Sequence, residues 1–136
     1  MNSIFTGANF FGVRLAQCKM VGSSFQDVHW TGTTIQGGDW SYCNLRYARV
    51  PQSDFSNARL VETDFSHADL KQSLFRKADL SRAILSQAQL KGSDLRGARV
   101  SGVDFREVSL NGVKLDFLQA ALVLQSLGAE VLEEDL

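Results

Sequence analysis

The 136-residue sequence predicts an all-β solenoid, in which the chain winds as stacked coils, followed by one short C-terminal α-helix. Three observations predict this fold. A large apolar residue recurs at every fifth position, a small residue usually lies two positions before it, and the pattern stops before a segment rich in helix formers. We therefore divide the chain into residues 1–115, which form the repeats, and residues 116–136, a tail for capping or dimerisation.

The five-residue period has no exception between Phe5 and Leu115. At 44% apolar composition, so long an unbroken run has a chance on the order of 10⁻⁸, so the period reflects the fold. The large residues are Phe5, Phe10, Leu15, Met20, Phe25, Trp30, Ile35, Trp40, Leu45, Val50, Phe55, Leu60, Phe65, Leu70, Phe75, Leu80, Leu85, Leu90, Leu95, Val100, Phe105, Leu110 and Leu115.

The other positions of the unit indicate how the chain turns. Neither a helix nor an alternating strand keeps a five-residue stripe on one side, so the chain must turn after each unit. We expect the large and the small residue to face one core, and successive coils to stack at about 4.8 Å. Asp or Asn precedes the large residue in nine units, where we expect it to bond the backbone of the turn: Asn9, Asp39, Asn44, Asp54, Asp64, Asp69, Asp79, Asp94 and Asp104.

The tail predicts a helix that starts after Asp116, a suitable N-cap, and stops before Gly128. A helical wheel gives one broad apolar face, which we expect to cover the open end of the solenoid: Phe117, Ala120, Ala121, Val123, Leu124 and Leu127. The wheel places Gln119, Gln125 and Ser126 between this face and a second apolar patch.

The second patch consists of Leu118 and Leu122 and has two interpretations. It either packs under Val131 and Leu132, or it joins two chains in a two-fold dimer. We favour the dimer, with an interface made by Phe117, Leu118, Ala121 and Leu122.

The repeat units resemble those of a known family. Ala68-Asp69-Leu70-Lys71-Gln72, Ala78-Asp79-Leu80-Ser81-Arg82 and Ser93-Asp94-Leu95-Arg96-Gly97 are similar to the A(D/N)LXX unit of pentapeptide-repeat proteins. The resemblance covers residues 3 to about 115. It implies a right-handed quadrilateral β-helix with four units in each coil and nearly six coils in all.

The end of the chain resembles one group within that family. Gly112-Val113-Lys114-Leu115-Asp116, then Gln119-Ala120 and Leu127-Gly128, are similar to the C-terminal end of Qnr-type and MfpA-type proteins. This resemblance implies a homodimer joined through the C-terminal helix that binds DNA gyrase and topoisomerase IV and gives bacteria quinolone resistance. The repeats here lack the loops of Qnr proteins from Gram-negative bacteria. The alternative is therefore a scaffold that binds another protein partner.

Charge is divided unevenly along the chain. Residues 1–115 carry a net charge of +4 and residues 116–136 a net charge of −5, whereas family members proposed as DNA mimics present strongly acidic faces. The candidate partner-binding face is the one mildly acidic side, Asp27, Asp64, Asp104 and Glu107. We do not expect direct nucleic-acid binding, although one side is basic through Arg14, Arg76, Lys77, Arg96 and Lys114.

No residues form a catalytic, cofactor or metal pattern, so we expect a protein that is not an enzyme. His29 and His67 lie on different predicted faces, and Cys18 and Cys43 are expected to be buried and reduced. With no signal peptide and no membrane-spanning stretch, the chain is expected to be cytoplasmic. The exposed aromatic residues that could contact a protein are Phe11, Tyr42 and Tyr47.

Overall fold

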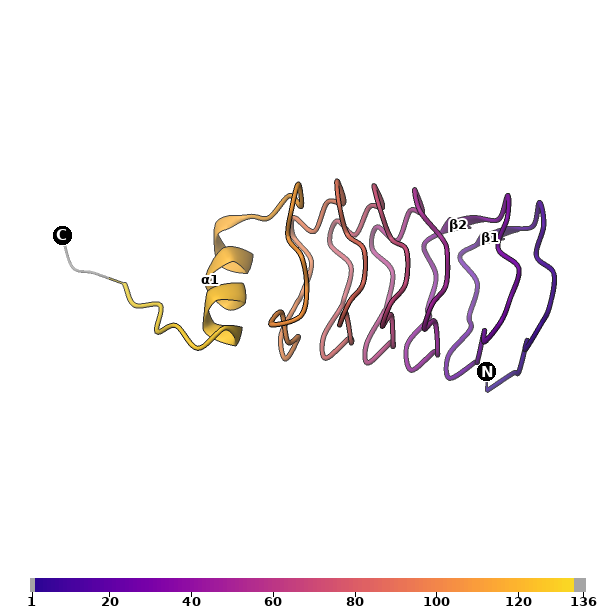
Figure 1. Ribbon diagram of the computed structural model, residues 1–136, viewed down its shortest axis with the longest axis horizontal. Helices are drawn as coiled ribbons and strands as arrows, with labels where there is room; N and C mark the ends of the chain where they lie inside the picture. Colours follow the sequence, from indigo (N-terminus) through magenta and orange to yellow (C-terminus); the bar gives the residue numbers. More distant parts are fainter. Residues whose placement is uncertain (1, 134–136) are drawn as a thin grey trace.

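The computed structural model describes residues 2–133 and shows a chain that winds as stacked coils into a rod (Figure 1). The N-terminus lies toward one end of the rod, and helix α1, Phe117–Ser126, lies at the other. Parallel backbone bridges join Asn44 to Asp64 and Asp64 to Ile84, so one coil takes twenty residues, or four five-residue units. None of the helical structure within residues 2–133 is long and apolar enough to cross a membrane.

Extended strand is short because the chain turns after every unit. Strands β1, Arg14–Ala16, and β2, Thr34–Gln36, form a parallel pair in which Leu15 lies opposite Ile35. Most other contacts between coils consist of single parallel bridges and the hydrogen bonds that flank them. The ladder of backbone bonds between coils therefore holds the rod together.

Turns depend on two positions of the unit. Each of the nine Asp and Asn residues accepts a hydrogen bond from the backbone N–H two residues later, as predicted. The second residue after most of the large ones has a positive φ, as the third position of a type II turn requires. Non-glycine residues adopt this conformation at a cost of about 1–2 kcal/mol each, among them Tyr42, Tyr47 and Lys77.

The core contains every large residue of the repeat. Eighteen of them are buried, and the five that are half-buried lie toward the ends of the rod: Phe5, Phe10, Met20, Leu110 and Leu115. Phe55 and Phe75 stack from adjacent coils, with ring centroids 5.3 Å apart. The small position also satisfies polar groups, because Thr63 Oγ1 donates to the Trp40 carbonyl oxygen at 2.8 Å.

The two cysteines are free thiols in different surroundings. Cys43 is buried and donates to the Met20 carbonyl oxygen, and burial raises the pKa of its thiol to about 11. The prediction that both are buried is wrong for Cys18, which is half-buried. Cys18 lies in the first coil, which has a neighbouring coil on one side only.

Helix α1 closes the rod with polar side chains. Gln119 is buried, and its Nε2 donates to the carbonyl oxygens of Leu95 and Ala98. Asp116 Oδ2 accepts from the Gly97 N–H at 2.8 Å, while its Oδ1 caps the helix at the N–H of Gln119. These side chains contact backbone groups that another coil would otherwise pair, so α1 replaces the next coil at this edge.

The prediction that the broad apolar face of the tail covers the solenoid is therefore wrong for Phe117, Leu124 and Leu127. Phe117, Leu124 and Leu127 are 98%, 50% and 51% exposed, whereas Gln119 and Ser126 face the last coil, where Ser126 Oγ accepts from the Phe105 N–H at 3.4 Å. The physical reason is that a solenoid ends in unpaired N–H and C=O groups, which only polar side chains satisfy. Of the predicted face, Val123 is buried, and Ala120 and Ala121 are half-buried.

We expect Gln119→Leu to lower the free energy of unfolding by roughly 2 kcal/mol, because it leaves two carbonyl oxygens without their donor. Urea denaturation followed by circular dichroism measures the difference. The matched control is Gln125→Leu on the exposed side of the same helix, which should change stability by less than about 0.5 kcal/mol. Equal effects of the two substitutions would contradict this role of Gln119.

Candidate functional site

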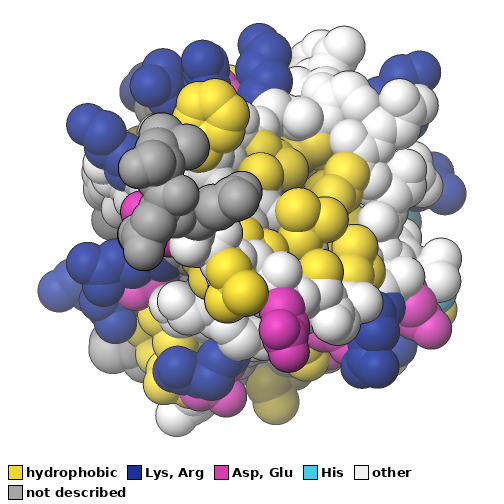
Figure 2. All heavy atoms as spheres, turned by 90° about the vertical axis from the view of Figure 1, so that its left-hand side faces the viewer, with side chains coloured by type: hydrophobic (Ala, Val, Ile, Leu, Met, Phe, Trp, Pro, Cys, Tyr) yellow, Lys and Arg dark blue, Asp and Glu magenta, His cyan; other side chains and the backbone are white. Residues whose placement is uncertain are grey.

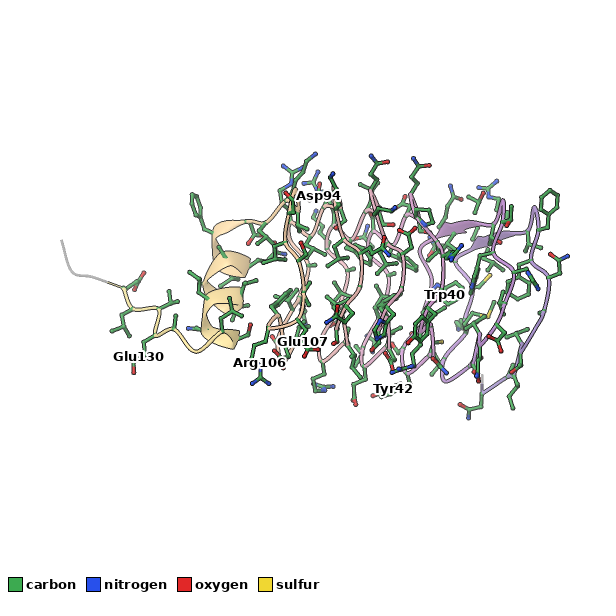
Figure 3. The ribbon with its side chains drawn as sticks, in the orientation of Figure 1. Trp40, Tyr42, Asp94, Arg106, Glu107 and Glu130 are labelled. Carbon is green, nitrogen blue, oxygen red and sulfur yellow. The ribbon has the colours of Figure 1, made fainter. Side chains whose placement is uncertain are left out.

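Two of the four acidic candidates are paired with arginines, and Figure 3 shows Glu107 beside Arg106 near α1. Asp64 lies 3.3 Å from Arg46, and Asp104 forms a 2.7 Å ion pair with Arg106 that lowers the pKa of its carboxyl to about 2. Both aspartates also hold turns through their Oδ1 atoms. Asp27 is exposed, and Glu107 accepts from the Ser86 hydroxyl at 2.8 Å. Asp27 and Glu107 also lie in turns, but their carboxylates accept no hydrogen bond from a turn N–H.

The most shielded ion pair lies on the predicted basic side. The Asp94 carboxylate is 6% exposed and accepts from Arg96 Nε at 3.0 Å and Nη2 at 2.8 Å. These hydrogen bonds lower the pKa of Asp94 to about 2. Much of the Arg96 charge is thus neutralised, which reduces the positive potential of the basic side.

Asp94 makes stability depend on pH. A folded pKa below the unfolded value stabilises the protein fully above about pH 4 to 5, and the stabilisation is lost as the pH falls toward 2. We expect Asp94→Asn to cost about 1–2 kcal/mol at pH 7, after allowance for the exposed arginine, and less than about 0.5 kcal/mol at pH 2. Urea titrations of both proteins between pH 2 and 7 measure the difference in their free energies of unfolding.

A second variant checks the cause of this effect. Arg96→Gln leaves the Asp94 carboxylate in place but removes its partner. The pH at which stability is lost should therefore rise toward the ordinary pKa of an aspartate. A constant gap between wild type and Asp94→Asn across the whole pH range would contradict the role of the ion pair.

The three aromatic candidates are exposed, as predicted. Phe11 lies near the N-terminal end, 70% exposed, whereas Tyr42 and Tyr47 lie on adjacent turns of one coil. Tyr47 differs from Tyr42 in its surroundings. Its ring stacks on His67 at 4.7 Å between centroids, and the Arg46 guanidinium lies 5.9 Å from the ring centroid.

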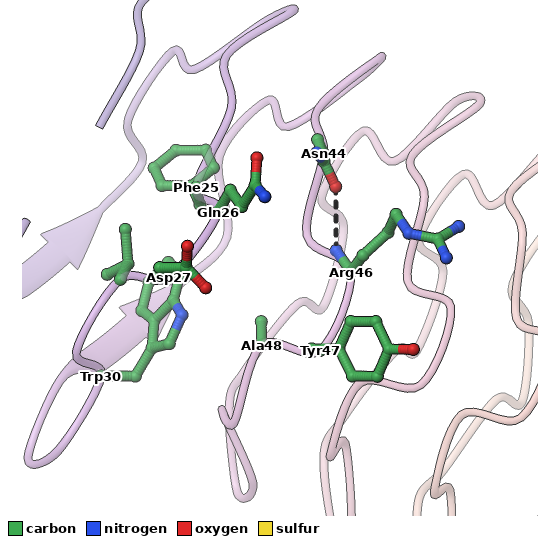
Figure 4. A pocket seen from close by; sticks show the side chains of 9 residues that line it. Phe25, Gln26, Asp27, Trp30, Asn44, Arg46, Tyr47 and Ala48 are labelled. Carbon is green, nitrogen blue, oxygen red and sulfur yellow. Dashed lines mark hydrogen bonds between the residues drawn. The ribbon is translucent and has the colours of Figure 1, made fainter. Parts of the chain in front are cut away.

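Tyr47 also borders a cleft that the sequence did not reveal (Figure 4). The cleft has a volume of about 510 Å³ and lies between two adjacent coils, with its floor made by buried side chains of the repeat. One signal in the sequence is the Gly37-Gly38 pair, which places glycine in the small position of a unit. Its lining residues are Phe25, Gln26, Asp27, Val28, Trp30, Asn44, Arg46, Tyr47 and Ala48.

The predicted dimer interface is only partly on the surface. Phe117 and Leu118 are exposed, and Ala121 is half-buried. Leu122 is wrongly placed in the second patch, because it packs against the core of the solenoid beside Val123. The interpretation that Leu118 packs under Val131 and Leu132 is also wrong, since Leu118 is 71% exposed.

Hydrophobic side chains gather on the end of the rod that α1 covers (Figure 2). Among the described residues, the large apolar side chains exposed at this end are Phe117, Leu118, Leu124, Leu127, Val131 and Leu132. We call this set the end patch. The acidic tail continues to Glu134 and Asp135, which lie outside the described residues.

Both histidines lie near Tyr47. His67 stacks on Tyr47, and His29 lies in the preceding coil next to the same ring. Within residues 2–133, no three His, Cys, Asp or Glu side chains are placed to hold a metal ion.

Comparisons with known proteins agree with the repeat. The family model for the pentapeptide repeat region matches residues 8–83, and the model for pentapeptide repeats (8 copies) matches residues 73–112. No curated protein matches this chain.

Solved structures share the fold. HetL from the cyanobacterium Nostoc sp. strain PCC 7120, a pentapeptide-repeat protein involved in the regulation of heterocyst differentiation, has a TM-score of 0.69 and 25% identity. The match covers 84% of this chain and 52% of HetL, so the chain spans about half the length of HetL.

Trypsin-treated QnrB1, a plasmid-mediated fluoroquinolone resistance protein, has a TM-score of 0.54 and 23% identity over 98% of this chain and 67% of its own. A thylakoid-lumen pentapeptide-repeat protein of Arabidopsis thaliana has a TM-score of 0.50 and 22% identity over 81% of this chain and 77% of its own. The chain belongs to the pentapeptide-repeat family and has that family's right-handed β-helix solenoid fold.

Proposed function

We propose that this pentapeptide-repeat protein is a non-enzymatic, protein-binding solenoid that acts as a homodimer joined through α1. The end patch carries this proposal, because several large apolar side chains are exposed together there. Contiguous exposed apolar patches are typical of protein–protein contacts. A two-fold dimer would bury the same patch on both chains.

We further propose a type II topoisomerase in the cytoplasm as the partner. Two observations support this: the resemblance of residues 112–128 to Qnr-type and MfpA-type ends, and the fold shared with QnrB1. Two quadrilateral rods of nearly six coils, at about 4.8 Å per coil, give a dimer about 55 Å long. This length equals that of about sixteen base pairs at 3.4 Å each, so the dimer fits a groove that holds duplex DNA.

The second candidate is a scaffold that binds a different protein. The pairing of Asp64 with Arg46 and of Asp104 with Arg106 favours it, because a DNA mimic needs unpaired negative charge on its surface. Assays of gyrase decide between the two candidates.

We expect the protein to act weakly on gyrase supercoiling at tens of micromolar, with or without a quinolone, and to lose this effect at high salt. The paired substitution Asp27→Lys with Glu107→Lys should remove the effect, because neither side chain accepts a hydrogen bond within its turn. Asp64 and Asp104 are poor choices for this test, since each accepts a backbone hydrogen bond within its turn.

The matched control is the triple substitution of Arg76, Lys77 and Arg96 by Ala on the basic side, which should leave the gyrase effect nearly unchanged. An effect lost with this control would show contact with nucleic acid or an acidic partner, and would contradict mimicry. No effect of the unaltered protein on either reaction would contradict the topoisomerase proposal and favour the scaffold.

A further inference from the structure

The ladder of backbone hydrogen bonds is broken on one side of the rod, between residues 27–32 and residues 46–51. We call this segment the interruption. Within residues 2–133, the N–H groups of Asp27, Trp30 and Arg49 form no backbone hydrogen bond, and neither do the carbonyl oxygens of Val28, Arg46 and Arg49. The outer sides of both segments are paired normally, since His29 N–H donates to Ala8 and Val50 N–H donates to Asp69.

A change of register explains the interruption. Ser24 pairs with Asn44, twenty residues later, whereas Gln36 pairs with Asp54, eighteen residues later. The segment 24–36 therefore has two residues more than the segment 44–54 of the next coil between these two bridges. It cannot follow its neighbour at a constant distance there, so the regular rungs are lost.

Gly37 and Gly38 let the chain return to the normal register at the bridge of Asp39 with Arg59. Gly38 has a φ of +102°, and a Cβ there would lie 2.6 Å from the Cys18 carbonyl oxygen, so glycine is required. Trp40 Nε1 holds this bend by donating to the Gly37 carbonyl oxygen at 3.0 Å. The interruption is thus encoded by specific residues of the sequence.

The cleft of about 510 Å³ lies at the interruption (Figure 4). Phe25, Val28 and Ala48 contribute apolar surface to it, and a second hollow of about 280 Å³ continues along the same two segments. The volume of the cleft lies within the range of ligand sites, about 300–1,000 Å³. Tyr47 borders both hollows, so removing its ring would open the site to solvent.

One side-chain donor at the cleft is free and open to solvent. Trp30 is 7% exposed, and its Nε1 makes no hydrogen bond within residues 2–133, in contrast to the Nε1 of Trp40. Figure 4 shows the indole nitrogen on the side of the ring that faces Ala48 and Tyr47. A ligand that accepts from this donor would take the place of solvent water.

A second break in the ladder lies near α1 but differs from the first. The Leu85 and Leu90 N–H groups form no backbone hydrogen bond within the described chain, and the hollow there is about 190 Å³. The bridges on either side of this break, Asp79 with Arg99 and Asp94 with Lys114, keep the twenty-residue register. No tryptophan borders that hollow, so its lining offers no equivalent of the free Trp30 donor.

We propose that the interruption is a binding site for an extended peptide segment of a partner protein. A peptide in β conformation carries alternating N–H and C=O groups, which match the free backbone groups of residues 27–32 and 46–51. One apolar side chain of the peptide would lie on Phe25, Val28 and Ala48, and one of its carbonyl oxygens would accept from Trp30 Nε1. This inference rests on the proposed protein-binding role and is independent of the identity of the partner.

The test uses a random heptapeptide library displayed on phage, selected on the intact protein and counter-selected on Tyr47→Gly. The strongest peptide is then synthesised, and its affinity is measured by fluorescence anisotropy. A second form of the peptide carries N-methyl groups on alternate residues, which removes backbone donors but keeps the side chains. We expect the N-methylated form to bind at least tenfold more weakly.

Matched variants locate the site. Tyr47 and Tyr42 both have a φ of +60°, so Tyr47→Gly and Tyr42→Gly both relieve strain and should both fold. Tyr47→Gly should weaken peptide binding at least tenfold, whereas Tyr42→Gly should leave it unchanged. Trp30→Phe keeps an aromatic ring but removes the donor, and should weaken binding about two- to tenfold.

Three results would overturn the inference: a library that yields no Tyr47-dependent peptide, a peptide that binds equally well when N-methylated, or a peptide lost only when Phe117 and Leu118 are replaced. The third would assign the peptide to the end patch. Gyrase has no part in this experiment, so inactivity toward gyrase leaves the peptide site standing. Equally, a failed selection leaves the topoisomerase proposal standing.

Discussion

Phe65→Asp is expected to unfold the protein. Phe65 is fully buried and contacts two other rings of the core, with centroids 5.8 Å from Phe55 and 6.3 Å from Phe75. A carboxylate at this site has no cationic partner, and the cost of burying it adds to the loss of the ring, about 3–5 kcal/mol. Because small domains are stable by about 5–15 kcal/mol, this sum removes most or all of the stability.

Circular dichroism and a thermal unfolding curve measure this effect. Phe65→Leu is the size-matched control and should remain folded with a lower melting temperature. Gln72→Asp places the same carboxylate at an exposed turn and should unfold near the wild-type temperature. A cooperatively folded Phe65→Asp protein would contradict the inward orientation of the whole repeat.

The core was predictable because the period alone decides which side chains point inward. One residue in five must be large, and each of these positions is buried or half-buried in the structure. The turns were predictable for the same reason, since Asp or Asn before the large residue accepts the N–H of the turn. The turn chemistry and the packing of the core favour the same residue types at these positions, so the sequence pattern is sufficient to predict both.

The contacts of α1 were not predictable from hydropathy. A helical wheel assumes that apolar side chains face the protein, and that assumption fails where the protein surface is a row of unpaired backbone groups. Gln119 and Ser126 face the last coil because they hydrogen-bond to it, and Phe117 is left outside. Two polar residues seven positions apart on a capping helix would have been the sequence signal for these contacts.

The cleft was missed for a different reason. The apolar period continues without a break through Trp30, Ile35 and Trp40, so it gives no sign that the backbone register changes there. Register depends on how adjacent coils pair, and the pattern within one coil does not contain this information. At the cleft, the Gly37-Gly38 pair and Val28, which fills the small position of its unit, depart from the usual unit.

The last expected result concerns assembly. We expect wild-type protein to be a dimer in light scattering, and the double variant Phe117→Lys with Leu118→Lys to be a folded monomer of 15.0 kDa. Both side chains are largely exposed in the single chain, so their loss removes little packing within it. In the dimer they would lie at the centre of the end patch, where four charged lysine side chains would take the place of apolar contacts.

Substitutions at Phe117 and Leu118 test the dimer interface without disturbing the packing of the single chain. Leu122→Lys would test stability, because Leu122 packs against the core. The matched control is Ile4→Lys with Phe11→Lys at the opposite end of the rod, where both side chains are also exposed, and it should remain a dimer. A double Phe117 and Leu118 variant that stays dimeric, or a control that becomes monomeric, would place the interface elsewhere.

Salt gives a second check on the same interface. Residues 116–136 carry a net charge of −5, so a dimer joined through α1 brings two acidic tails together. Their repulsion is screened as ionic strength rises, because the Debye length falls from about 30 Å at 0.01 M to about 8 Å at 0.15 M. The wild-type dimer should therefore tighten between these salt concentrations. A dimer that dissociates as salt is added would depend on attraction between opposite charges, which the end patch does not offer.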